Sequence, residues 1–335
     1  MTDAHVLVTT SWLGPDDEVH QLLVDAGLSV SYRPLPDRTA DDGPLREALA
    51  RCDAVIAGTA RFDAPFLARA PRLKVIARTG AGYDNIDVDA ATARGIAVCP
   101  TPGVNGQSVA EHTLGLLLSV ARAIPQSVAA VRAGRWEQHS GRELGGAVLG
   151  VVGLGAIGRR VATMARAIGM VVVAHDPLAD REFADAHGIR LLPLERLLAA
   201  ADFVTLHLAL SPATRHLLDA AALARMKPGA RLVNTARGGI VDEDALADAL
   251  AAGALAGAAL DTVETEPLPN GHRLRGFDNV LVTAHIGAAT REARARSGLA
   301  AARSVVAVLN GSVPEHVINP AFAARATAPR RGGAA

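Results

Sequence analysis

Hydrophobic positions in this chain come in short, nearly continuous runs of Val, Ile, Leu and Ala that alternate with amphipathic stretches from end to end. Strands that are buried on both faces of a parallel sheet have this pattern. The runs predict strands at residues 6–10, 28–32, 54–59, 73–78, 96–99, 148–153, 171–175, 203–208, 230–234, 257–261 and 280–283. Because helical stretches separate the strands, the chain is predicted to have an α/β fold with right-handed crossovers.

The chain of 335 residues is too long for one ordinary domain and predicts two doubly wound parallel-sheet domains. We expect the first domain at residues 1–101, completed by a C-terminal helix within 288–320, and the second domain at 102–287. A helical segment at 105–123 is apolar on more than one face, so it is expected to cross between domains or to pack against a second subunit. The tail at 321–335 is expected to be disordered.

Composition narrows the class of protein. The 34 basic and 34 acidic residues balance, so nothing favours nucleic acid or an anionic membrane as a partner. Cys52 and Cys99 are too few for a disulfide framework, which indicates a reducing compartment. No apolar run reaches the roughly 18 residues of a membrane span, and the N-terminus lacks the pattern of a signal peptide. We therefore expect a cytoplasmic protein without a membrane partner.

A glycine motif follows the predicted strand at 148–153. Gly153, Gly155 and Gly158 have the spacing Gly-x-Gly-x-x-Gly and lead into a helical run. The first glycine permits a tight turn, the second lets a pyrophosphate approach the backbone, and the third lets the helix pack on the strand. Asp176 ends the next predicted strand, 18 residues after Gly158, close to the position of an acid that binds ribose hydroxyls. These features predict a dinucleotide site at the N-terminus of the helix.

The charge at Asp176 favours NAD over NADP, because a carboxylate there would repel a 2′-phosphate. Arg159 and Arg160 are the counter-argument, since arginines near this position accommodate the 2′-phosphate of NADP. We interpret these two arginines as a solvated pair on the first turn of the helix.

Over about residues 5–320, the chain resembles the D-isomer-specific 2-hydroxyacid dehydrogenase family, especially its phosphoglycerate dehydrogenase-like branch. Besides the glycine motif, the resemblance rests on RTGAGYDNID at 78–87, SVAEH at 108–112, NTARGGIVDE at 234–243, DTVETEPLP at 261–269 and TAHIG at 283–287. It implies a flavodoxin-like substrate domain, a Rossmann NAD-binding domain, and hydride transfer between NAD and C2 of a D-2-hydroxy acid.

The resemblance also implies that Arg237, Glu266 and His285 are the catalytic residues. Reduction of a 2-keto acid requires a proton for the keto oxygen and an anchor for the carboxylate. His285 is expected to be the acid in reduction and the base in oxidation, because histidine titrates near neutral pH. Glu266 is expected to bond its other ring nitrogen, and the planar guanidinium of Arg237 to bind the substrate oxygens. No metal site is predicted.

Further contacts are carried over from the resemblance. The residues expected to bind the cofactor are Gly153, Gly155, Ala156, Ile157, Gly158, Asp176, His207, Leu208, Thr214, Thr235, Ala236, Arg237, Asp261, His285, Gly287 and Ala81. The residues expected to bind the substrate are Arg78, Gly80, Ala81, Gly82, Arg237 and His285, with the backbone amides of the loop at 78–82 facing its carboxylate. His112, beside Glu111, is interpreted as a helix-packing residue.

Some positions depart from the family pattern. Ala57 and Gln138 stand where phosphoglycerate-specific relatives place basic residues, and Arg61 or His139 are the candidate replacements. Phosphoglycerate, glycerate or hydroxypyruvate, and glyoxylate therefore stay open as substrates. Ala284 stands where proline is usual before the catalytic histidine, which is expected to change loop rigidity and not chemistry.

Two other functions stay open. Corepressors share this fold and the catalytic residues, so the chain could be a non-catalytic NAD(H)-sensing interaction protein, although only a short basic end suggests an interaction tail. Formate dehydrogenase is less similar, because it has glutamine where Glu266 stands. A homodimer through the segment at 105–123 is expected from the family, and feedback by serine is not, because no regulatory domain follows residue 320.

Overall fold

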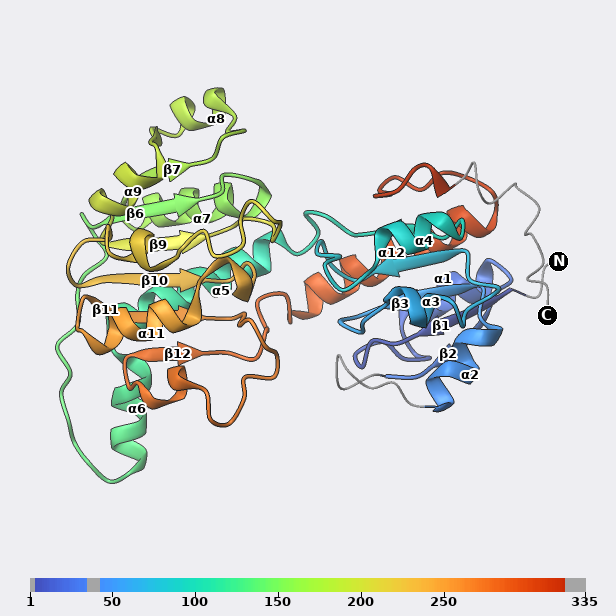
Figure 1. Cartoon of the computed structure of the whole chain (residues 1–335), viewed down its shortest axis with the longest axis horizontal. Coiled ribbons are helices and arrows are strands. Elements are labelled where there is room, and N and C mark those ends of the chain that lie inside the picture. The colour runs from blue at the N-terminus through green and yellow to red at the C-terminus, as the bar shows by residue number, and fades with distance from the viewer. Residues whose placement is uncertain (1–3, 35–42, 323–335) are drawn as a thin grey trace. The chain divides into compact units, whose positions relative to one another are not determined.

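The computed structural model describes residues 4–34 and 43–322, and these form two compact units. The first unit combines the described residues of Met1–Asn105 and Thr290–Ala335, and the second consists of Gly106–Ala289. Each contains one parallel sheet covered by helices (Figure 1). Of the tail that was predicted to be disordered, residues 323–335 lie outside the described residues, and Phe322 is buried in the first unit.

The first unit has a five-stranded sheet in the order β2-β1-β3-β4-β5. This is the flavodoxin-like order, as the family resemblance implied. The strands are β1 (His5–Val8), β2 (Ser29–Tyr32), β3 (Ala54–Ala57), β4 (Val75–Arg78) and β5 (Ala97–Cys99). The helices are α1 (Glu18–Asp25), α2 (Gly43–Arg51), α3 (Ala64–Leu67), α4 (Val88–Ala93) and α12 (Arg291–Leu309).

The C-terminal helix α12 belongs to this first unit. It packs against α1, β3 and β4. Ala301, Ala302 and Val305 of α12 are buried in the same core as Val6 and Val8 of β1. The C-terminal segment therefore covers the sheet that the N-terminal segment forms, and the second unit is inserted between the two segments in the sequence.

The second unit has a seven-stranded sheet in the order β12-β11-β10-β9-β6-β7-β8, with all strands parallel. Six strands follow the Rossmann order, and β12 extends it by one. The strands are β6 (Val148–Val152), β7 (Val171–His175), β8 (Arg190–Leu191), β9 (Phe203–Leu206), β10 (Ala230–Asn234), β11 (Leu255–Leu260) and β12 (Val280–Val282). The helices are α5 (Gly106–Ala121), α6 (Ile124–Arg132), α7 (Ala156–Ala167), α8 (Arg181–Ala186), α9 (Leu194–Ala200), α10 (Ala220–Leu223) and α11 (Glu243–Ala251), with 3-10 turns at Gly238–Ile240 and Arg273–Gly276.

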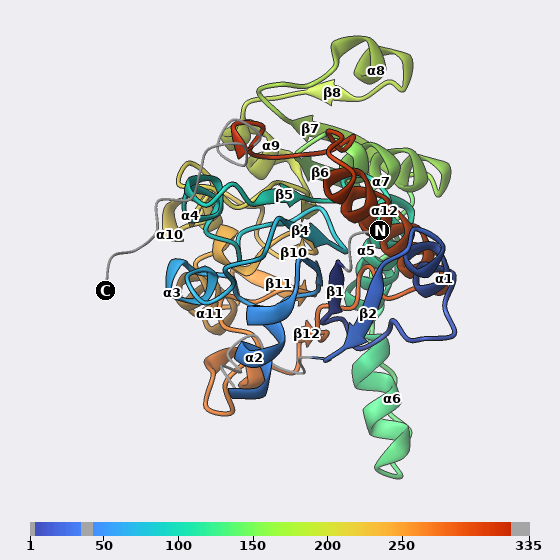
Figure 2. The ribbon, with the colours of Figure 1, turned by 90° about the vertical axis from the view of Figure 1, so that its right-hand side faces the viewer.

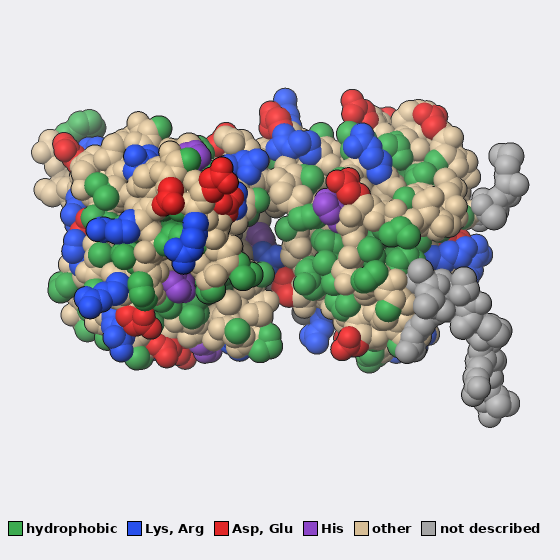
Figure 3. Space-filling view, turned by 90° about the horizontal axis from the view of Figure 1, so that it is seen from above, with side chains coloured by type: hydrophobic (Ala, Val, Ile, Leu, Met, Phe, Trp, Pro, Cys, Tyr) green, Lys and Arg blue, Asp and Glu red, His purple; other side chains and the backbone are tan. Residues whose placement is uncertain are grey.

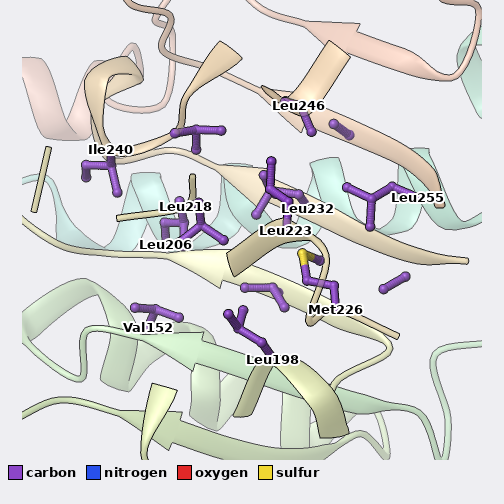
Figure 4. Packing of buried hydrophobic residues seen from close by; sticks show 14 of the residues in the cluster. Val152, Leu198, Leu206, Leu218, Leu223, Met226, Leu232, Ile240, Leu246 and Leu255 are labelled. Carbon is purple, nitrogen blue, oxygen red and sulfur yellow. The ribbon is translucent and has the colours of Figure 1, made fainter. Parts of the chain in front are cut away.

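Both faces of this sheet are buried, which explains its unbroken apolar runs. Val152 and Leu206 point into a core shared with α9, α10 and α11 (Figure 4). Val151 and Phe203 enter the opposite core, which α5 and α7 cover. Since side chains alternate along a strand, one apolar run supplies both cores.

Aspartates begin several of the helices. The side chains of Asp63, Asp87, Asp180, Asp219 and Asp242 each accept a hydrogen bond from the backbone amide three residues on. Such N-caps satisfy an amide that has no partner within the helix, and each contributes about 1 kcal/mol. The short helices therefore start at fixed positions close to the strand ends.

Among the described residues, no single helix is both long and apolar enough to cross a membrane. In the searched part of the chain, residues 4–34 and 43–322, one pair of helices, α5 and α6, reaches that length and composition when taken together, and the pair is bent by 66° at its break.

Candidate active site

The candidate residues of the second unit follow the carboxyl ends of neighbouring strands. In sheet order, His285 follows β12, Glu266 follows β11, Arg237 follows β10, His207 follows β9, the glycine motif follows β6 and Asp176 follows β7. Because all strands are parallel, these residues share one edge of the sheet. Strands β6 and β9 are paired at its centre, where the strand order reverses, and ligands of open α/β sheets bind at such a switch point.

His285 and Glu266 are in direct contact. Nδ1 of His285 lies 2.9 Å from Oε2 and 3.1 Å from Oε1 of Glu266. The histidine side chain is 31% exposed and the glutamate side chain 17% exposed. Among the described residues Nε2 of His285 has no hydrogen-bond partner, whereas Nδ1 faces a carboxylate that can accept a hydrogen bond from it. In this pair Glu266 fixes Nδ1 of His285, and Nε2 is left available for another partner.

The backbone of His285 is in the left-handed region, with φ of +53°. A residue with a Cβ adopts this conformation only when its surroundings impose it, and such residues gather at functional sites. Here the amide of His285 donates to the carbonyls of Asp261 at 2.9 Å and Thr283 at 3.0 Å. The turn after β12 is therefore tied to the end of β11.

Asp261 is the centre of this turn and is 2% exposed. Its carboxylate accepts from His112 at 3.2 Å, from Thr283 at 2.6 Å, and from the amides of Ile286 and Gly287 at 2.8 Å each. Burial opposes ionisation, but these hydrogen bonds outweigh it and hold the pKa of Asp261 well below its usual range. A Cβ at Gly287 would lie 2.9 Å from the carboxylate, so this position requires glycine.

Arg237 is positioned by its neighbours on β10. The Asn234 amide donates to the Arg237 carbonyl at 2.8 Å, and its oxygen accepts from the Ala236 amide at 3.0 Å. The half-buried guanidinium donates to the Ala236 carbonyl at 2.8 Å. A Cβ at the next residue, Gly238, would lie 1.9 Å from the carbonyl carbon of Val263. The Arg237 turn thus packs directly against the backbone that leads to the candidate glutamate.

The glycine motif has the geometry of a dinucleotide loop. Gly153 has φ of +95°, and a Cβ there would lie 2.5 Å from the carbonyl oxygen of His207. A Cβ at Gly158 would lie 2.0 Å from the carbonyl oxygen of Gly153, so helix and strand touch there. Gly155 borders open space, with nothing within 4 Å of its Cβ position, and precedes the first turn of α7. NAD fits such a cradle, because the open glycine and the helical amides of Ala156 and Ile157 suit a pyrophosphate.

Asp176 ties the end of β7 to this loop. One carboxylate oxygen accepts from the amide of Leu154 and the other from the amide of Leu178, both at 2.8 Å. The side chain is half-buried. A carboxylate has about four acceptor directions, so ribose hydroxyls can share it with these amides.

The interpretation of Arg159 and Arg160 as a solvated pair is wrong for Arg159. Its guanidinium donates to Asp180 at 3.2 Å and to the carbonyl of Leu154 at 3.1 Å, and lies 4.7 Å from the ring centre of Phe183. The nearby carboxylate and aromatic ring hold it in place. Arg160 is exposed.

His207 carries an imidazole that is enclosed by protein. Nε2 lies 3.0 Å from the hydroxyl of Thr205, and Nδ1 is a buried atom without a hydrogen-bond partner in the described chain. Burial lowers the pKa of His207 to about 3. The ring is therefore neutral at neutral pH, and the backbone carbonyl of His207 lies against Gly153 of the glycine loop.

This burial predicts a pH-dependent stability. The folded protein keeps His207 neutral down to about pH 3, whereas the unfolded chain binds a proton near pH 6.5. The unfolded state holds more protons in this window, so the free energy of unfolding falls as the pH falls through it. Between about pH 7.5 and about pH 5 this residue should account for about 2 kcal/mol. Urea unfolding of the wild type and His207→Gln at both pH values measures it; an equal loss in both proteins would contradict the prediction.

Three further predicted cofactor contacts have partners within the protein. A Leu208 methyl lies against Gly153, 2.9 Å from its Cβ position. The hydroxyl of Thr214 accepts from the Ser211 amide at 2.8 Å and shapes the loop after β9. The hydroxyl of Thr235 is buried and lies 2.8 Å from that of Thr113 on α5.

The loop at 78–82 lies in the first unit. Arg78 is buried, and its Nε donates to the carbonyl of Gly82 at 2.9 Å, so the guanidinium shapes the loop from within. The Gly80 carbonyl accepts from Thr101 at 3.0 Å, and Ala81 is exposed. Nothing lies within 4 Å of the Cβ position of Gly80, so its backbone borders open space.

The two candidate replacements for the missing basic residues are close to carboxylates. Arg61 is 74% exposed and lies 3.6 Å from Asp63. His139 lies 3.9 Å from Glu137 in the second unit. Ala57 ends β3 as a buried residue, and Gln138 is exposed. Throughout residues 4–34 and 43–322, no group of three His, Cys, Asp or Glu side chains is arranged to hold a metal ion.

Sequence reasoning missed several residues that build this edge. His112 was interpreted as helix packing but bonds the Asp261 carboxylate, and Thr283 bonds the same oxygen. Asn234 and Gly238, both within a motif noted above, were given no role. The only available signal was the presence of polar residues and glycines in those motifs, because their partners lie far away in sequence.

The fold and the site together define a Rossmann-type dinucleotide-binding class: a parallel sheet whose edge carries the glycine loop, the acid Asp176 and a carboxylate-paired histidine. Comparison with known proteins agrees. The model of the family described as D-isomer specific 2-hydroxyacid dehydrogenase, NAD binding domain, matches residues 114–287. The chain belongs to this family, and its cofactor is NAD.

Three relatives illustrate the family. D-3-phosphoglycerate dehydrogenase of Mycobacterium bovis is 46% identical over 285 residues, which cover 83% of this chain and 54% of that protein, so the chain spans about half the length of the curated relatives it matches. A glyoxylate reductase structure from Paecilomyes thermophila has a TM-score of 0.82 and 30% identity, covering 95% of this chain and 99% of the other. D-lactate dehydrogenase from Aquifex aeolicus, complexed with NAD and lactic acid, has a TM-score of 0.81 and 28% identity, covering 94% and 99%.

Proposed function

We propose that this protein is an NAD-dependent oxidoreductase that interconverts a D-2-hydroxy acid and its 2-keto acid. The observation that carries the proposal is the contact of His285 with Glu266, at 2.9 Å, on the sheet edge that also carries the dinucleotide loop. A histidine whose Nδ1 is hydrogen-bonded to a carboxylate can exchange a proton through Nε2, because the carboxylate fixes the tautomer and stabilises the imidazolium.

Each residue at the edge has a part in this reaction. NAD would be held by the glycine loop and Asp176, and there it would supply the acceptor for the hydride of C2. His285 takes the hydroxyl proton through Nε2 in oxidation and gives it back in reduction. Glu266 keeps the ring oriented and charged, and Arg237 pairs its planar guanidinium with the carboxylate and the oxygen at C2. Gly153, Gly155 and Gly158 hold the pyrophosphate, and Asp176 the ribose.

The other predicted cofactor contacts belong to the same proposal. These are Ala156, Ile157, His207, Leu208, Thr214, Thr235, Ala236, Asp261 and Gly287, with Ala81 from the first unit. We assign the first unit the role of substrate domain. Its loop at 78–82 would bind the substrate carboxylate, because the backbone at Gly80 borders open space and a glycine-rich turn suits the presentation of amides to an anion.

The substrate class is a small 2-hydroxy or 2-keto acid: phosphoglycerate, glycerate or hydroxypyruvate, or glyoxylate. Purified protein should oxidise NADH with at least one keto acid of this panel, followed as the loss of absorbance of NADH. A second function, a non-catalytic NAD(H)-sensing protein, is supported by the catalytic residues that such proteins share with enzymes. NADH binding without turnover of any keto acid in the panel would favour the sensor and reject the oxidoreductase.

The preference for NAD is expected to depend on Asp176. Asp176→Ala should weaken NAD binding by on the order of 10-fold, the scale of a lost charge-assisted hydrogen bond, and should weaken NADP binding much less, because the removed carboxylate repels a 2′-phosphate. Fluorescence titration with NADH and NADPH measures both affinities. Since the same carboxylate holds the amide of Leu154 at 2.8 Å, equal weakening of both cofactors would show that Asp176 only supports the loop.

We further propose a cytoplasmic homodimer. Ile124, Val128 and Val131 form one face of α6 and are 44–50% exposed, and α6 projects from the second unit (Figure 2). An exposed apolar face on a helix next to α5 suits a second copy of the chain. Sedimentation should give twice the chain mass of 34.5 kDa, and a monomer would reject the dimer. Acidic and basic side chains are interspersed on the face seen in Figure 3. This mixed charge does not favour nucleic acid or a membrane as a partner.

A further inference from the structure

His112 lies on α5, yet its side chain meets residues that follow β11 and β12. Nε2 lies 3.2 Å from Oδ1 of Asp261 and 3.3 Å from the hydroxyl of Thr283. Thr283 donates to the same carboxylate oxygen at 2.6 Å. Two side chains from different elements therefore hold one oxygen of a buried carboxylate. Because a carboxylate only accepts, Nε2 of His112 carries a proton in this contact whether or not the ring is charged.

Asp261 is also hydrogen-bonded to the turn that carries His285. Three consecutive backbone amides of this turn donate hydrogen bonds to Asp261. The His285 amide donates to its carbonyl at 2.9 Å, the Ile286 amide to Oδ1 at 2.8 Å and the Gly287 amide to Oδ2 at 2.8 Å. The turn in which His285 takes a positive φ is therefore fixed by the orientation of the Asp261 carboxylate.

Four donors reach this carboxylate in the described part of the chain. Oδ1 accepts from the side chains of His112 and Thr283 and from the amide of Ile286, and Oδ2 accepts from the amide of Gly287. The amides move with the turn. Thr283 begins the same turn after β12, so of these four donors His112 is the one that comes from another element, α5.

We propose that His112 is a positioning residue for His285 and acts through Asp261. The inference rests on the proposed function, in which His285 moves the proton. Proton transfer requires the ring nitrogen within hydrogen-bond reach of the substrate oxygen, and displacements on the order of 1 Å cost up to 100-fold in rate. The donor on Oδ1 sets the plane of the carboxylate, the carboxylate sets the turn, and the turn sets the ring.

Kinetics with paired variants tests the proposal. His112→Phe keeps a ring and removes the donor, and is expected to lower kcat by on the order of 10-fold, with KM and the Kd of NADH changed by no more than a few-fold. His112→Gln restores an N–H donor and should recover most of kcat. Thr283→Val removes the second donor without altering α5 and should repeat the kcat loss. His316→Phe, at an exposed site in the first unit, is the control and should match the wild type.

Hydrogen–deuterium exchange supplies a readout without turnover. The amides of Ile286 and Gly287 should exchange faster in His112→Phe than in the wild type, and at the wild-type rate in His112→Gln. Unchanged kcat and exchange in His112→Phe would overturn the inference, as would equal impairment of the Phe and Gln variants. If the wild type reduces no keto acid, the proposed function fails, and exchange alone decides whether His112 fixes the turn.

Discussion

Replacement of His285 by alanine is expected to lower kcat for keto-acid reduction by at least ~100-fold, the scale of a lost general acid. The affinity for NADH should stay within a few-fold, because the pyrophosphate and ribose contacts lie on other strands. The loss of kcat is expected because His285 is paired with Glu266. Nδ1 is 2.9 Å from the carboxylate, so Nε2 is the nitrogen that can exchange a proton. Steady-state kinetics, together with fluorescence titration of NADH, separates the loss of turnover from a loss of binding.

His216 offers a matched control for this experiment. It also has a left-handed backbone, with φ of +49°, and its Nε2 lies 2.5 Å from a carboxylate oxygen of Glu264. His216→Ala therefore removes the same kind of side chain and carboxylate pair from the same unit, and should keep most of kcat. If His285→Ala retained half of the wild-type activity, His285 would have no place in the mechanism.

Much of the fold could be predicted because the burial of each strand leaves a run of apolar residues in the sequence. Every predicted strand is present, since a sheet covered on both faces needs apolar runs such as Val148–Val152. The strand β8 (Arg190–Leu191) was missed, because two residues, one of them charged and exposed, cannot show a periodicity. The helix predicted at 105–123 ends two residues earlier, as α5, before a left-handed Ala123 turns the chain into α6.

The site residues also differ in whether the sequence could predict their roles. The roles of Gly153 and Gly158 follow from local geometry, because each must let a backbone oxygen approach, and the structure has those approaches at 2.5 Å and 2.0 Å from the Cβ positions. The bond from His112 to Asp261 spans 149 residues. A hydrogen bond between single polar residues leaves no repeating pattern, so only the fold reveals it. The same holds for Arg159, whose partner Asp180 is known only once α7 and α8 are placed.

Gly238 is the position where an added methyl group should do most damage. A Cβ would lie 1.9 Å from the carbonyl carbon of Val263 and 2.3 Å from the amide nitrogen of Glu264. Backbone atoms cannot rotate away as a side chain does, so the two segments must separate. Gly238→Ala is expected to lower the free energy of unfolding by about 1–3 kcal/mol. It should also lower kcat on the order of 100-fold, because Arg237 and the segment leading to Glu266 lose their register. Urea unfolding and steady-state kinetics measure the two effects.

The next residue separates this effect from the general cost of replacing a glycine. The three atoms nearest to a Cβ at Gly239 would be the ends of the Arg215 and Leu210 side chains, at 3.3–3.5 Å. Such side chains can shift by a few tenths of an ångström, so Gly239→Ala should keep near-wild-type stability and kcat. Equal losses in the two variants would mean that the whole 3-10 turn resists substitution. A stable, active Gly238→Ala would mean that the Arg237 turn does not depend on its contact with the backbone before Glu266.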